Sequence, residues 1–159
     1  QRAHASGSFT SGRGTAQRSS SVLRRAITGT TISQLYFNGS SLKADLGTSN
    51  RLWAAELTLA ASINTVGNGT APLAVGNSFV GKRYFAIKRV TNDAGTALVG
   101  AVETLGTDKL DANMAGSVIT ITADTTDGSA KIEFTPCTLA GSTTVTRVVA
   151  HLELVELAI

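Results

Sequence analysis

His151 and Glu153 are the two side chains that most resemble an acid–base couple. They lie two residues apart in segment 144–157, in which apolar and polar residues alternate. In an extended strand this spacing places both on one face, about 7 Å apart along the chain. That distance is too long for a direct hydrogen bond, so each is expected to reach a separate partner. Since no Gly-x-Ser-x-Gly motif is present, the pattern favours a structural contact, within a sheet or between subunits, over proton transfer.

Two pairs of aspartates have the composition of a glycosidase site, Asp108 with Asp111 and Asp124 with Asp127. Both pairs lie in segments typical of turns, where aspartate caps backbone N–H groups. Neither segment carries the aromatic side chains expected around a sugar. Gly12-Arg13-Gly14 lacks the Lys-Ser/Thr pair of a phosphate loop. We therefore expect no catalytic residue, no bound cofactor and no metal ion.

Positive charge is concentrated at the N-terminus. The first 25 residues contain five arginines and no Asp or Glu, in a chain of formal net charge +3. Such a segment suits an acidic partner, either a nucleic acid or a protein surface. It lacks interleaved aromatics and lysine runs, which argues against nucleic acid and leaves contacts with a neighbouring subunit, or simple hydration. The candidate contacts to a subunit or partner are Arg13, Arg18, Arg24, Arg25, His151 and Glu153.

The composition is that of one β-rich domain. Its 159 residues suffice for a single core, and only 16% are charged, so that Ser, Thr, Gly and Asn must supply much of the surface. The single cysteine, Cys137, cannot form an intrachain disulfide and is expected to be buried. No apolar run has the length of a membrane span. Residues 1–21 are expected to form an arm or tether, and residues 22–159 a β-sandwich domain.

Segment 53–63 is the clearest strand, because its side chains alternate strictly with a period of two. One face is expected to be buried: Trp53, Ala55, Leu57, Leu59, Ala61 and Ile63. The final segment, 144–157, has apolar residues on both faces. A strand of this kind is covered on both sides, so we expect one face to meet the core and the other a neighbouring chain.

Turn signals divide the rest of the chain into short strands. Asn38-Gly39 predicts a hairpin over 35–46. Turns at 91–95, Asp127-Gly128 and 139–142 separate further alternating segments. A helical turn over 105–114 is expected, with Thr107 as its N-cap. The remaining strands are predicted at 22–27, 34–37, 82–90, 96–105, 117–123 and 130–135. The fold class is all-β, an antiparallel sandwich or jelly-roll with an extended N-terminal arm.

The order of the motifs resembles a small domain of tailed-bacteriophage virion proteins. LYFNGSS at 35–41, the Trp-led strand at Trp53, AGTALVG at 94–100, TADTTDGSAKIEF at 122–134 and a Val/Glu-rich final strand carry the resemblance, with GTAQRSSSVLRR at 14–25 before them. Residues 64–81 are more Gly-rich than in that family, and its usual Trp in the last strand is missing. The resemblance implies a domain that closes a tail fibre or tail-associated protein, and offers no catalytic residues.

Three interpretations of function follow. The first is a structural domain of a virion, a homotrimeric tail fibre or tail-tip knob that contacts other virion proteins or a host surface receptor. The second is a trimeric capsid decoration protein. The third is a carbohydrate-binding module, which the low aromatic content of 5% disfavours. An enzyme is the least favoured.

Overall fold

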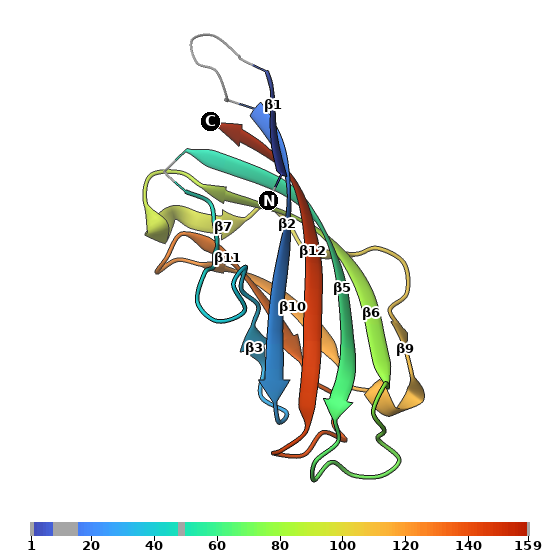
Figure 1. The fold of residues 1–159 in the computed structure, drawn as a ribbon. Coiled ribbons are helices and arrows are strands. Elements are labelled where there is room, and N and C mark those ends of the chain that lie inside the picture. The colour runs from blue at the N-terminus through green and yellow to red at the C-terminus, as the bar shows by residue number, and fades with distance from the viewer. Residues whose placement is uncertain (1, 8–15, 48–49, 159) are drawn as a thin grey trace.

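The computed structural model describes residues 2–7, 16–47 and 50–158, which form two antiparallel sheets (Figure 1). Strand residues are rich in Val, Ile, Leu and Thr, which favour extended backbone. Apart from strands, the regular elements of the described residues are two 3-10 turns, η1 (Asp93–Gly95) and η2 (Ala112–Met114). The predicted all-β antiparallel class is confirmed.

The large sheet has the strand order β1-β2-β12-β5-β6-β7, and the short strands β8 and β9 also pair with β6. Four long strands form its body, and Figure 1 shows β12 lying between β2 and β5. The C-terminal strand is therefore hydrogen-bonded along both edges. The bounds are β1 (Arg2–Gly7), β2 (Ala16–Thr28), β5 (Arg51–Thr65), β6 (Ser78–Arg89), β7 (Thr96–Leu98), β8 (Glu103–Thr104), β9 (Lys109–Leu110) and β12 (Val145–Ala158).

The small sheet is built around β11 (Ser129–Thr135), which pairs on one edge with β10 (Val118–Asp124). Two short strands, β3 (Ser33–Gln34) and β4 (Ala44–Asp45), pair with β11 as well. They lie end to end, because β3 pairs near the C-terminal end of β11 and β4 near its beginning. The small sheet covers one face of the large one (Figure 1).

The core lies between the two sheets. The rings of Phe79 in the large sheet and Phe134 in the small sheet meet edge to face, with centroids 5.4 Å apart. Buried residues from both sheets form one cluster around this contact, which includes Cys137, as predicted. Two packed antiparallel sheets make a β-sandwich. The jelly-roll alternative, which requires two Greek keys of four strands, is not confirmed.

The alternation predicted for 53–63 is confirmed. All six residues of the predicted apolar face are buried, and Trp53 is 5% exposed. Leu57 and Leu59 are fully buried, and burying each side chain contributes roughly 1.5–3 kcal/mol. The period of two thus both identifies the strand and orients it toward the small sheet.

The N-terminal boundary differs from the one predicted between residues 21 and 22, which falls inside β2. Pairing of β2 with β12 begins at Ala16, and β1 pairs with the first part of β2. Ser19 and Ser21 are buried on the same side as Leu23. The buried side of this part of β2 is thus made of small hydroxyl side chains. Because serines are not hydrophobic, the sequence pattern does not reveal the strand. Arg13 lies outside the described residues.

The predicted hairpin over 35–46 is wrong, although its turn is present. Gly39 has a positive φ of 84°, and the side-chain oxygen of Asn38 accepts hydrogen bonds from the three backbone N–H groups of residues 40–42. The flanking strands, however, pair with β11 and not with each other. A turn signal predicts only that the chain bends. It carries no information on whether the flanking strands pair with each other or with a strand far away in the sequence.

Two further predictions in the middle of the chain need correction. The strand expected at 96–105 is divided into β7 and β8 around Gly100, whose φ is 83°, and the two pieces pair with different parts of β6. The helical turn over 105–114 shrinks to η2, with Asp111 rather than Thr107 at the N-cap position. The turns at 91–95 and at Asp127-Gly128 are present: the side chain of Asn92 caps η1, and Gly128 has a φ of 63°.

Candidate functional site

The side of the large sheet that faces away from the small sheet is called the outer face here. It is formed by the exposed side chains of β2, β12, β5 and β6, which alternate with the buried ones along each strand. Three of its valines are about half exposed: Val22 (51%), Val149 (50%) and Val155 (56%). The final strand therefore has one apolar face in the core, as predicted, and a second that no described residue of this chain covers.

Charged side chains on the outer face lie in a row across the sheet. The strand register places Glu153 of β12 directly opposite Glu56 of β5, and Glu56 opposite Tyr84 of β6. Like charges in directly opposite positions repel. Two cations offset the repulsion, Arg18 at 2.8 Å from Glu153 and Lys82 at 3.3 Å from Glu56.

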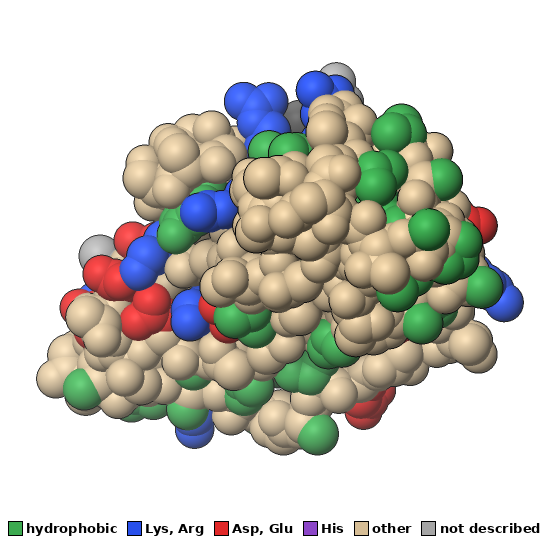
Figure 2. Space-filling model, turned by 90° about the horizontal axis from the view of Figure 1, so that it is seen from below, with side chains coloured by type: hydrophobic (Ala, Val, Ile, Leu, Met, Phe, Trp, Pro, Cys, Tyr) green, Lys and Arg blue, Asp and Glu red, His purple; other side chains and the backbone are tan. Residues whose placement is uncertain are grey.

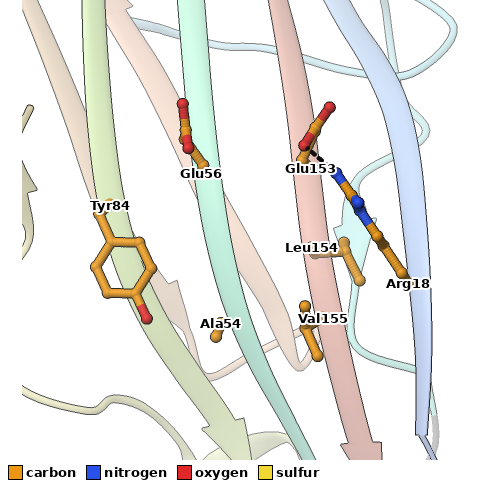
Figure 3. Close-up of a pocket in the computed structure, with 7 residues that line it drawn as sticks. All are labelled: Arg18, Ala54, Glu56, Tyr84, Glu153, Leu154 and Val155. Carbon is orange, nitrogen blue, oxygen red and sulfur yellow. Dashed lines mark hydrogen bonds and ion pairs between the residues drawn. The ribbon is translucent and has the colours of Figure 1, made fainter.

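These residues surround a shallow depression of about 320 Å³ on the open sheet. Figure 3 shows Arg18, Glu153, Glu56 and Tyr84 arriving from four neighbouring strands, with the smaller Ala54 and Val155 below them. Both members of the Arg18–Glu153 pair are exposed, at 68% and 44% of their side-chain surfaces. An ion pair of this exposure contributes about 0–1 kcal/mol, so it organises the surface more than it stabilises the fold.

His151 and Glu153 have separate partners in the structure. The hydroxyl of Ser20 lies 2.8 Å from His151 Nε2, whereas Glu153 accepts a hydrogen bond from Arg18. A serine hydroxyl beside a histidine is the beginning of a nucleophile–base pair. Such a pair also needs a third group that orients the imidazole, and among the described residues Glu153 is engaged with Arg18 instead.

The predicted arginines occupy three different environments. Arg18 pairs with Glu153, and Arg25 stacks over the ring of Tyr36 at 5.2 Å. Arg24 and Arg147 flank a second depression, of about 210 Å³. Sequence reasoning missed Arg147, although its place two residues from Val149 and four from His151 assigns it to the same face of β12. It also missed Ser20 and Glu56, because only the strand register brings them beside His151 and Glu153.

The aspartates considered as catalytic pairs have structural partners. Asp108 binds Arg83 through two hydrogen bonds of 2.6 and 2.7 Å, and Asp111 accepts one of 2.7 Å from the backbone N–H of Ser78. Asp124 and Asp127 both contact Lys43.

Burial by itself would raise the pKa of Asp124, but hydrogen bonds from Lys43 and from the backbone N–H groups of Thr126 and Asp127 outweigh it and lower the pKa. The pKa of Lys43 is raised, chiefly by its hydrogen bonds to Asp127 and Asp124. Both shifts favour the charged forms of the two groups. The cluster therefore ties the β10–β11 turn to the segment before β4.

On the face seen from below (Figure 2), charged side chains gather in a few groups and leave wide areas uncharged. Figure 2 shows the molecule from below, with broad areas of backbone and uncharged polar side chains and with hydrophobic side chains scattered between them. No group of three or more His, Cys, Asp and Glu side chains that could hold a metal ion occurs within the described residues. No helix among them is long and apolar enough to cross a membrane.

Comparison with known proteins finds no matching family model and no matching curated protein. Among solved structures, the tailspike protein of Acinetobacter baumannii phage AM24 is similar over 86% of this chain, with 12% identity and a TM-score of 0.48. The tailspike protein of Acinetobacter phage vB_ApiP_P1 is similar over 92%, with 13% identity and a TM-score of 0.34. The chain spans about a quarter of the length of each, 26% and 22%.

Proposed function

We propose that this chain is a structural domain of a tailed-bacteriophage virion, a tail fibre or tail-tip module that assembles as a homotrimer and acts in assembly or host attachment. The observation that carries the assembly part is the outer face. Its exposed valines lie on β2 and β12, strands whose opposite sides form the core. The phage part rests on the order of turn motifs in the sequence, and the all-β sandwich agrees with it.

The outer face has the size of a subunit interface. β12 contains 14 residues, and four strands of this length span on the order of 850 Å² at the usual rise and spacing of strands. A standard protein interface buries about 800 Å² on each partner. Neighbouring copies of the chain seated against this face would cover the half-exposed valines and the row of paired charges.

The proposed role is structural and not catalytic. The Ser20–His151 pair lies on an open sheet, and His151 is exposed. We expect His151→Ala and Glu153→Gln to alter oligomer strength and to change no turnover of glycans or peptides. Cleavage of a host polysaccharide by the purified chain, lost on either substitution, would show that the domain is a depolymerase.

Of the three Trp and Tyr rings, only Tyr84, which is 42% exposed in the first depression, is open to a sugar, so the carbohydrate-binding alternative rests on that ring. A sugar stacks on an exposed aromatic ring, and Trp53 is 5% exposed. Tyr36 is already stacked by Arg25.

Light scattering on the purified chain tests the assembly. We expect a particle of three chain masses at micromolar concentration, and a well-folded monomer would overturn the trimer. An electron cryo-microscopy map of a virion carrying this chain tests the location. Density at the tail supports the proposal, and density spread over the capsid would replace it with the decoration protein.

A further inference from the structure

Two neighbouring arginines on the outer face have no ionic partner among the described residues. Arg24 on β2 lies opposite Val149 of β12, and Arg147 of β12 lies opposite Ala26. Together they flank the second depression. The other arginines whose side chains the structure describes all have a partner, either a carboxylate or, for Arg25, a ring and a carbonyl: Arg18, Arg25, Arg51, Arg83 and Arg89.

Arg24 and Arg147 occupy diagonal positions on adjacent strands, which lie about 7–8 Å apart at the backbone. Like charges on neighbouring side chains repel. An acidic group placed between them removes that repulsion, and each guanidinium offers paired donors that suit a carboxylate. The depression has a small apolar floor, Ala26 and Val149, which leaves room for such a group.

One carboxylate of the described residues lies at the other edge of the same sheet without an ion pair. Glu103 is on β8, where it pairs in register with Tyr84 of β6. Directly opposite residues share a face, so Glu103 also belongs to the outer face, and it is exposed. Within one chain β12 and β5 separate β2 from β6, so Glu103 cannot reach Arg24.

We propose that Glu103 of one copy pairs with Arg24 and Arg147 of the next, in a head-to-tail contact between opposite edges of the outer face. This inference rests on the proposed function and names the contact by which the copies associate. A two-fold dimer would make this contact twice between the same two copies, whereas a head-to-tail arrangement repeats it around a ring when the rotation closes. The charges therefore name the two edges that meet, and the homotrimer of the proposed function selects the ring.

The offset between the two patches sets how the strands would be inclined in a ring. Arg24 and Glu103 lie four residues apart along the strand register, through Val149 and Glu153, which is about 13 Å. Four strand spacings, from β2 to β8, are about 19 Å. In a ring, strands inclined by about 35° to the symmetry axis would bring the two patches to the same height.

Charge reversal tests the contact. Arg147→Glu and Glu103→Arg, each in the full chain, are expected to weaken association about tenfold or more, because each places like charges against each other. The double variant, Glu103→Arg with Arg147→Glu, restores an opposite pair and is expected to recover most of the loss. Lys131→Glu, an equal charge change on β11 of the small sheet and away from the outer face, is the matched control and should leave association unchanged. Sedimentation equilibrium measures the association, and circular dichroism confirms that each variant is folded.

The outcomes separate this inference from the proposed function. If the wild-type chain is a trimer and the double variant recovers nothing, the contact is wrong while the trimer stands. If the wild-type chain is a monomer, both fail. If the single variants leave the trimer intact and Arg147→Glu instead abolishes binding of an acidic polysaccharide such as polygalacturonate, the arginines bind an external ligand and the subunit contact is overturned.

Discussion

On the inner face of the large sheet, β5 presents Trp53, Leu57 and Leu59 to the small sheet. On the outer face the same strand presents Ala54, Glu56 and Thr58, which are partly or fully exposed. The inner face is held by apolar packing. The outer face carries ion pairs between exposed partners, together with charges that have no ionic partner among the described residues. One pleated strand thus serves two purposes, because successive side chains point to opposite sides. The inner face makes the fold, and the outer face is available for association.

The largest expected difference between the faces comes from Trp53. Replacing Trp53 by Ala leaves a cavity beneath the small sheet and should lower the free energy of unfolding by about 3–5 kcal/mol. Chemical denaturation monitored by circular dichroism measures it. The fluorescence of Trp53 in the native protein should be that of a buried indole, and a solvent-like maximum would contradict its 5% exposure.

Val148 and Val149 are adjacent on β12 and form a matched pair for the two faces. Val148 is 1% exposed and Val149 is 50% exposed. Val148→Ala should lower the free energy of unfolding by roughly 1–3 kcal/mol. Val149→Ala should change it by less than about 0.5 kcal/mol in the dissociated chain, and should weaken association instead. Equal losses in unfolding would show that the outer face is part of the fold.

Two arginine–carboxylate pairs allow the same comparison for charge. The side chains of Arg83 and Asp108 are 9% and 23% exposed, against 68% and 44% for Arg18 and Glu153. Asp108→Asn should cost about 1.5–3 kcal/mol of stability, because a partly buried, charge-assisted double hydrogen bond is lost. Glu153→Gln should cost about 0–1 kcal/mol. A cost for Glu153→Gln as large as that for Asp108→Asn would refute the distinction.

The smallest effect on stability is expected at Lys43, which lies next to the small sheet that covers the inner face. Because the pKa of Asp124 is lowered from 3.8, its contribution to stability is present above that value and is lost as the pH falls through the lowered pKa. Because the pKa of Lys43 is raised from 10.5, its contribution is present below that value and is lost as the pH rises through the raised pKa.

Lys43→Met should therefore flatten both limbs of the stability–pH profile, with a change at neutral pH of less than about 1 kcal/mol. Thermal unfolding from acid to alkaline pH measures the profile. Lys82→Met, which removes an exposed outer-face pair of 50% and 47% exposure, is the control and should flatten it less. An unchanged stability–pH profile in Lys43→Met would show that the ion pairs of Lys43 with Asp124 and Asp127 do not contribute to stability.

Much of the architecture follows from local pattern. The period of two in 53–63 and 144–157 identified the two central strands and the faces that are buried. Turn residues identified the bends at Asn38-Gly39, at 91–95 and at Asp127-Gly128. These signals are local because backbone sterics and side-chain alternation act within a few residues.

Pairing between distant strands was decided only by the tertiary structure. It placed β3 and β4 on β11, brought Ser20 to His151, and set Glu56 opposite Glu153. It also extended the large sheet back to Ala16, through serines that look like a flexible arm. Register joins residues more than a hundred positions apart, and it is selected by the fit of whole faces rather than by any one segment. The sequence by itself therefore determined where the two central strands lie and which way they face. The tertiary structure decided which strands pair, which charges meet and which described charges have no partner.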